Sequence, residues 1–349
     1  MNITAYLKAT VLGLILAATF NSSAQSNLDG IKGDEQSDDN EIQLTNESPQ
    51  ELLLEYEIER TKNFSNGYKS TNRTTLDNLN TISNRAQLSL AETYEAHYIQ
   101  YKQSGFTSAG LEFLKIAEQN TENKAELYSD FIACSHVLKK ELLFDKYTSK
   151  LRNSGFITNE VLEYNKNVLR SIETEASFIV TNGWEDTYPL LSLLTQENKT
   201  ATQVINAEWI LDPEYRKLIA ARLGTSNPSF NDNPYDWILT VSQSTSSAIY
   251  FTPTLPRSVL LKAQESLTPI GIVFSLNPIT AAEQKRQCIN AWKMFSKVEL
   301  ISNSDLCTNY IFIFSVLEDL LANDQSEKGT LNQVLAYKKQ LLKKYPALK

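Results

Sequence analysis

Residues 182–188, reading Asn-Gly-Trp-Glu-Asp-Thr-Tyr, are the best candidate for part of a ligand-binding or catalytic site. They follow an apolar, β-branched run at 177–181 that is typical of a buried strand. Carboxylates and amides can hold sugar hydroxyls or a hard cation, and aromatic rings can stack on a sugar. The candidate ligand-binding residues of this loop are Asn182, Trp184, Glu185, Asp186, Thr187 and Tyr188.

The same loop also has a structural interpretation. The Asn-Gly pair at 182–183 can turn the chain because both residues readily adopt positive φ. Asp186 or Thr187 can then cap a helix that has Pro189 in its first turn. We favour this interpretation over ligand binding, and binding over catalysis, in which Glu185 and Asp186 would divide the acid and base roles of hydrolysis.

A strand, a tight turn and a helix form the first half of a βαβ unit. Further strands are predicted at 202–206, 237–241, 247–252 and 271–276. Ligands bind beyond the carboxyl ends of the strands in open α/β sheets. Asn206, Glu208 and Thr252 therefore join the candidate ligand-binding residues, and Trp209 offers a further stacking ring.

Helical patterns surround the strands. Residues 48–51 form a capping box, and one apolar stripe from 76 to 101 predicts a long helix. Ser-Gly-Phe segments at 104–106 and 154–156 end two helices, and each is followed by a Thr that caps the next helix. Three helical segments then run from 281 to near 345.

The predicted fold is α/β: a small, mostly parallel, Rossmann-like sheet with helices, preceded by an all-α region of helical hairpins and followed by C-terminal helices. The predicted parts are a signal peptide (1–24), a disordered acidic linker (25–48), a helical domain (49–172), an α/β domain (173–278) and a C-terminal helical region (279–349).

The N-terminus predicts export. Lys8 supplies a positive charge, residues 9–20 are apolar but short for a bilayer span, and 22–24 read as a cleavage site. We expect cleavage after Ala24, no transmembrane segment afterwards, and a soluble protein in the periplasm or outside the cell.

Composition and residue usage argue against some classes of partner and site. The formal charge of −8 argues against a nucleic-acid partner, because phosphate binding needs clustered Lys and Arg. We predict packing or surface roles for His97 and His136, a buried packing role for Cys134, and leave open whether Cys288 and Cys307 form a disulfide. No cofactor or metal site is predicted.

Four separated stretches resemble the soluble region that follows the transmembrane half of the protein-O-mannosyltransferase-like membrane glycosyltransferases of Bacteroidota. The residues that carry this resemblance are Asn182, Gly183, Asp186, Thr187, Tyr188, Pro189, Leu190, Val204, Asn206, Tyr250, Phe251, Thr252, Gly271 and Val273. The resemblance spans residues 176–276 and implies an exported accessory α/β domain from a Bacteroidota bacterium.

The resemblance does not extend to catalysis. The membrane half, where such enzymes hold the sugar donor and the acidic catalytic residues, has no counterpart in this sequence, so glycosyl transfer is not implied. Trp184 and Glu185 occupy positions where the family often has small or amide residues.

We therefore expect an exported, non-enzymatic protein that interacts with a protein or glycan partner in the cell envelope. The sequence contains no G-x-S-x-G, phosphate-loop or H-E-x-x-H motif. The alternative is a carbohydrate-binding or hydrolytic, carbohydrate-active protein that uses the 182–188 loop.

Overall fold

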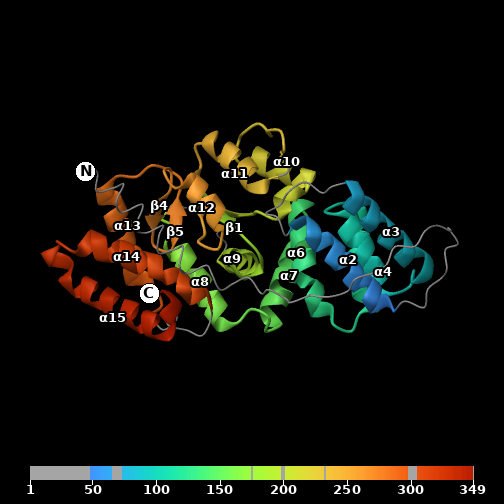
Figure 1. Cartoon of the computed structure of the whole chain (residues 1–349), viewed down its shortest axis with the longest axis horizontal. Helices are drawn as coiled ribbons and strands as arrows, with labels where there is room; N and C mark the ends of the chain where they lie inside the picture. Colours follow the sequence, from blue (N-terminus) through green and yellow to red (C-terminus); the bar gives the residue numbers. More distant parts are fainter. Residues whose placement is uncertain are drawn as a thin grey trace, which may run out of the picture. The chain divides into compact units, whose positions relative to one another are not determined.

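The computed structural model describes residues 48–64, 73–173, 176–197, 201–231, 233–297 and 305–348. The predicted signal peptide (1–24) and nearly all of the predicted linker (25–48) lie outside the described residues. The chain divides into two compact units at residues 122 and 123 (Figure 1). We call them the N-terminal helical unit and the larger unit. This division places residues 123–172, assigned from sequence to the helical domain, in the larger unit.

The described part of the N-terminal helical unit is built from helices. They are α2 (Pro49–Phe64), α3 (Arg73–Ser89), α4 (Tyr94–Ser104) and α5 (Ser108–Asn120). The capping box predicted at the start of α2 is confirmed. The Ser48 backbone N–H donates to the Glu51 carboxylate at 3.0 Å, and the Glu51 N–H donates to Ser48 Oγ at 3.2 Å.

The prediction of one continuous helix over 76–101 is wrong, because α3 ends at Ser89 and α4 begins at Tyr94. Thr93 has extended backbone dihedrals, and its Oγ1 accepts the Ala96 N–H at 3.2 Å, so it caps α4. The apolar spacing continues across the break because both helices face the same core.

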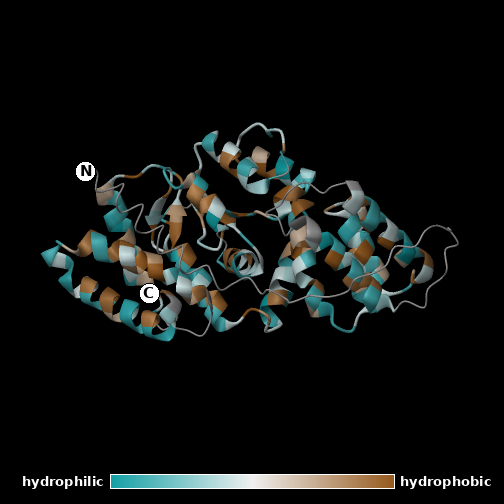
Figure 2. Ribbon diagram, in the orientation of Figure 1, coloured by the Kyte–Doolittle hydropathy of each residue, from teal (hydrophilic) through white to brown (hydrophobic). Residues whose placement is uncertain are grey.

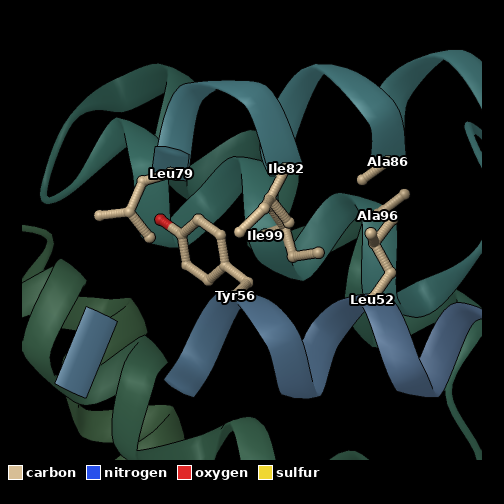
Figure 3. Packing of buried hydrophobic residues seen from close by; sticks show 7 residues of the cluster. All are labelled: Leu52, Tyr56, Leu79, Ile82, Ala86, Ala96 and Ile99. Atoms are coloured by element: carbon tan, nitrogen blue, oxygen red, sulfur yellow. The ribbon is translucent and has the colours of Figure 1, made fainter. Parts of the chain in front are cut away.

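That core is the cluster drawn in Figure 3. Its buried side chains come from α2, α3 and α4: Leu52, Tyr56, Leu79, Ile82, Ala86, Ala96 and Ile99. The Tyr56 hydroxyl keeps a hydrogen bond to Gln103 Oε1 at 3.0 Å, and burial raises the pKa of Tyr56 to about 12. The stabilisation of this unit therefore comes mainly from apolar burial between helices.

In the larger unit, helices precede the sheet and alternate with its strands. The first are η2 (Lys124–Leu127), α6 (Tyr128–Val137), α7 (Glu141–Asn153) and α8 (Asn159–Arg170). The strands are β1 (Ser177–Thr181), β2 (Thr202–Asn206), β3 (Ala248–Phe251), β4 (Thr268–Ile270) and β5 (Val273–Ser275). Between them lie α9 (Trp184–Gln196), η3 (Trp209–Leu211), α10 (Pro213–Arg222), α11 (Pro234–Gln243) and α12 (Arg257–Ala263).

The strand order is β2-β1-β3-β5-β4, with β1 in the interior of the sheet. Strand β1 pairs in parallel with β2, Ser177 opposite Thr202, and in parallel with β3, Ser177 opposite Ala248. All residues of β1 are buried, as expected for a strand covered on both faces. The predicted β1–α9–β2 unit, two adjacent parallel strands joined by a helix, is confirmed.

The prediction of a mostly parallel sheet is not confirmed. The sheet is mixed, because β5 is antiparallel to both β3 and β4. Strands β4 and β5 form a hairpin in which Ile270 pairs with Val273. Gly271 has φ of 54°, which suits the first central position of a tight hairpin turn. The strand predicted over 271–276 begins at this glycine, so the prediction missed the reversal.

The strand predicted at 237–241 is also wrong, because these residues belong to α11. Asn233 Oδ1 accepts the N–H groups of Tyr235 and Asp236, and Pro234 occupies the first helical position. A short apolar run does not distinguish a strand from a buried helix, and here the cap decides the outcome.

The three predicted C-terminal helical segments are confirmed as α13 (Ala281–Met294), α14 (Tyr310–Leu321) and α15 (Lys328–Lys344), with short 3₁₀ segments η5 (Asp305–Asn309), η6 (Gln325–Glu327) and η7 (Pro346–Leu348). Helix α14 is almost wholly buried, whereas α15 alternates apolar and polar residues (Figure 2). Across the described ranges, no helix combines the length and the apolar character that a membrane span requires.

The predicted helix ends at the Ser-Gly-Phe segments are confirmed. Gly105 and Gly155 have φ of 61° and 82°. Thr107 Oγ1 accepts the Gly110 N–H at 3.0 Å to cap α5, and Thr158 caps α8 in the same way. The turn before α5 is tight, because a Cβ at Gly110 would lie 2.2 Å from the Gly105 carbonyl oxygen.

Replacing Gly110 with Ala is expected to destabilise the N-terminal helical unit by about 1–3 kcal/mol, because the new methyl group overlaps a backbone oxygen. Gly329→Ala, early in α15 where a Cβ meets nothing within 4 Å, should instead be neutral or stabilise by up to about 1 kcal/mol. Urea unfolding followed by far-ultraviolet circular dichroism measures both changes. Equal effects of the two substitutions would contradict the steric overlap inferred at Gly110.

Candidate functional site

The loop after β1 enters α9 earlier than predicted. The helix begins at Trp184, with Gly183 at the N-cap (φ of 89°) and no side-chain cap. The predicted capping by Asp186 or Thr187 is therefore wrong, since both lie inside the first turns of the helix. Asp186 Oδ2 instead reaches back to accept the Asn182 backbone N–H at 2.9 Å.

The Asp186 carboxyl group is fully buried and joins the ends of β1 and β3 to α9. The Thr252 hydroxyl lies 3.0 Å from Asp186 Oδ2, and the Thr254 hydroxyl donates to the same oxygen. Burial raises the pKa of Asp186 to about 7, although the hydrogen bonds from Thr254, Asn182 and Thr252 oppose that rise. We call Asp186, Thr252, Thr254 and the Asn182 amide the Asp186 cluster.

A second buried network lies beside it, between β1, β2 and α9. Thr187 Oγ1 is 2.8 Å from Thr181 Oγ1 and accepts from Asn206 Nδ2 at 2.8 Å. Asn206 Oδ1 accepts the Trp209 N–H at 3.0 Å. The Asn206 N–H donates to the Tyr215 hydroxyl at 3.1 Å, and that hydroxyl is 3.4 Å from the Val204 carbonyl oxygen.

The Asn182 side chain connects the end of β1 to α11 and to the segment after β3. Its Oδ1 accepts from the Tyr235 hydroxyl of α11 at 2.8 Å, and its Nδ2 lies 3.3 Å from the Thr254 carbonyl oxygen. The chain's own groups thus fill the carboxyl ends of β1 and β3, where we predicted a ligand crevice. Of the candidate residues, Asp186, Thr187, Asn206 and Thr252 are brought together but are buried.

Pro189 lies within α9 rather than at its start, and it has no N–H to offer the Glu185 carbonyl four residues earlier. Asn165 of α8 compensates, because its Nδ2 donates to that carbonyl at 2.8 Å and to the Val161 carbonyl at 2.9 Å. This contact fixes the start of α9 against α8.

The remaining candidates lie nearer the surface. Glu185 and Glu208 are exposed, and Trp184 and Tyr188 are partly buried with ring centroids 6.0 Å apart. Tyr188 also lies 6.0 Å from the ring of Trp209. Burial, with the nearby carboxylates of Asp130 and Glu208, raises the pKa of Tyr188 well above its usual value.

A cavity of about 790 Å³ in the larger unit, whose lining includes His136 and Arg222, was not predicted from the sequence. We predicted packing or surface roles for the histidines, and the His136 ring does pack on Phe144, at 5.4 Å between centroids. Its hydrogen bond to Arg222, 3.0 Å from Nε2 to Nη1, was not foreseen. No sequence pattern links residues this far apart on separate helices.

The three cysteines are all buried in the larger unit. Cys134, Cys288 and Cys307 lie outside any disulfide, and burial raises the pKa of Cys288 to about 12. Within the described ranges, no group of three or more His, Cys, Asp or Glu side chains is arranged to hold a metal ion.

The Asp186 carboxyl group should make stability depend on pH. Because burial raises its pKa from 3.8 to about 7, the folded chain retains a proton that the unfolded chain has released in this interval. The stability contributed by neutral Asp186 is present below about pH 4 and is lost as pH rises to about 7. Relative to Asp186→Asn, the wild type should lose roughly 2–4 kcal/mol across the interval.

Urea unfolding followed by tryptophan fluorescence measures this difference, because all four tryptophans lie in the larger unit. Glu185→Gln, the same chemical change at the exposed neighbour, is the control and should not produce the slope. A wild-type-to-variant difference that is flat between pH 4 and 7, or that grows with pH in favour of the wild type, would contradict the proposed protonation.

Comparisons with protein-family models, with curated proteins and with solved structures find no match to this chain. The resemblance of residues 176–276 to the soluble region of Bacteroidota glycosyltransferases therefore stays a prediction, carried by the motif residues alone.

Proposed function

We propose that this chain is an exported, non-enzymatic accessory protein of the cell envelope, and that it acts by binding a protein partner. The predicted signal peptide supports export to the periplasm or beyond. We further propose that the parallel strands β2-β1-β3 with α9 derive from a Rossmann-like unit, as the motif residues suggest. In this proposal the unit serves as a rigid scaffold.

The proposal rests on the hydrogen bonds that the buried polar groups of the Asp186 cluster make with one another. Asp186 and Thr252 are both buried and hydrogen-bonded to each other. A general acid or nucleophile must come within hydrogen-bond reach of substrate. Groups that join β1, β3 and α9 inside the unit support a structural role instead.

A partner surface is suggested by α2 in the N-terminal helical unit. Leu54 and Ile58, one turn apart, are 60% and 44% exposed, while Leu52 and Tyr56 of the same helix face the core. A helix that is apolar on both its inner and outer faces favours contact with a second surface. Glu51 is also exposed on α2 and would add charge selectivity, whereas the exposed Glu55 already pairs with Arg85 at 3.1 Å.

The tagged full chain, purified from its native envelope after chemical crosslinking, tests this proposal. We expect a mature N-terminus at Gln25 and a defined crosslinked partner. Leu54→Gln with Ile58→Gln should abolish that crosslink, whereas Leu142→Gln, at an 89% exposed leucine of α7, should not. Recovery of a chain that still begins at Met1, or identical partners for all variants, would overturn it.

A second candidate function, carbohydrate binding, is favoured by the surface around Trp184. Two partly exposed aromatic rings, Trp184 and Tyr188, lie next to the exposed carboxylate of Glu185. Aromatic faces beside acceptor groups are a common way to hold a sugar ring.

A glycan array with the full chain tests this candidate. Trp184→Ala should weaken any binding at least about tenfold, because the stacking face is removed. Phe156→Ala, at an exposed aromatic residue of the same unit, should leave binding intact. Failure of the wild type to bind any glycan excludes this candidate, and sugar release that is lost in Glu185→Gln would favour the hydrolytic alternative.

A further inference from the structure

The 790 Å³ cavity lies at the opposite end of α9 from the 182–188 loop. Leu194 and Thr195, near the end of α9, contribute to its lining, and so does the start of β2. The end of α6, the start of α7 and the end of α10 complete the walls. Its volume falls within the range of small-molecule sites.

Arg222 places a guanidinium group in the lining of this cavity. Its Nη1 lies 3.0 Å from His136 Nε2, and a guanidinium can only donate, so that imidazole nitrogen accepts. Burial, reinforced by the charge of Arg222, lowers the pKa of His136 to about 3, so the imidazole is neutral. The histidine orients Arg222 without balancing its charge.

The charge of Arg222 has no anionic partner among the described residues. The influences on its pKa are burial, which lowers it, and the hydroxyl of Tyr215. The other charged groups of the lining are two lysines and two carboxylates, all exposed and balanced in sign: Lys139, Lys140, Glu141 and Asp145. A partly buried cation without a counter-ion is costly, and an anionic ligand would relieve that cost.

A second polar group in the lining lacks a partner. Gln203 Oε1 is buried and accepts no hydrogen bond from the described chain. An acceptor in this state favours a ligand that brings an N–H or O–H donor. The apolar part of the wall is formed by Leu191, Leu194, Val204 and Leu218.

We propose that this cavity binds a small organic carboxylate that has an apolar body and an N–H or O–H donor. The carboxylate pairs with the Arg222 guanidinium, which presents N–H donors in a planar fork that fits two carboxylate oxygens. The Gln203 side chain is only partly buried as a whole, so its amide can turn the unpartnered oxygen toward the cavity and accept from this donor. The apolar body packs on the leucines. His136 is a positioning residue, because it acts through Arg222.

N-acetyl-L-leucine carries all three features and is the first probe. Its neutral amide lacks the carboxylate, and 4-methylpentanoate lacks the N–H donor. By calorimetric titration of the full chain, the acid should bind in the millimolar range or tighter, as expected for its size. The neutral amide should bind at least about tenfold more weakly, because the charged hydrogen bonds are lost.

Matched variants assign the contacts. Arg222→Gln should weaken N-acetyl-L-leucine at least about tenfold, whereas Lys217→Gln, which removes an exposed charge from the same helix, should change it less than about twofold. Gln203→Leu should remove the preference for N-acetyl-L-leucine over 4-methylpentanoate. The same variant should raise the melting temperature of the free chain, since the buried Oε1 that lacks a donor is then gone.

Circular dichroism spectra that match the wild type show that each variant is folded. Equal binding of the acid and its amide would overturn the proposal, as would equal binding by Arg222→Gln and Lys217→Gln. Failure of N-acetyl-L-leucine, 4-methylpentanoate and phenylacetate to bind at millimolar concentration would also overturn it. Binding of acetyl-Ala-Ala-Ala-Leu more than about tenfold tighter than N-acetyl-L-leucine would replace the small molecule with a peptide C-terminus.

Discussion

The arrangement of the sheet and α9 depends on the burial of one carboxyl group, that of Asp186. This side chain contacts the end of β1 through the Asn182 N–H and the segment after β3 through Thr252. Burial favours the neutral form of this carboxyl group and raises its pKa, while the hydrogen-bond donors around it oppose that rise and satisfy its oxygen. These hydrogen bonds join the ends of β1 and β3 to the start of α9.

Much of the fold could be predicted from the sequence because its determinants are local. The capping box at Ser48, the glycines that end helices at 105 and 155, and the strand–turn–helix after Ser177 each depend on a few neighbouring residues. The mixed sheet could not be predicted in the same way. It follows from the turn at Gly271 and from pairings between strands far apart in the sequence.

The proximity of four candidate residues was predicted from the sequence, but their burial was not. The sequence placed Asp186, Thr187, Asn206 and Thr252 at one edge of the sheet, and the structure brings them together there. Tyr235 and Thr254 complete the hydrogen bonds at this edge, and neither residue was among the candidates from the sequence. The hydrogen bond between Arg222 and His136 could not be predicted for a similar reason, because it joins two helices, α10 and α6, that are far apart in the sequence.

The Tyr215 hydroxyl has a consequence for the outer side of β2, which is an edge strand of the sheet. This hydroxyl accepts the Asn206 N–H and lies close to the Val204 carbonyl oxygen. Without it, these two backbone groups could pair with another strand. A side chain from α10 therefore occupies the backbone groups through which two copies could join edge to edge. This protection discourages aggregation through the edge of the sheet.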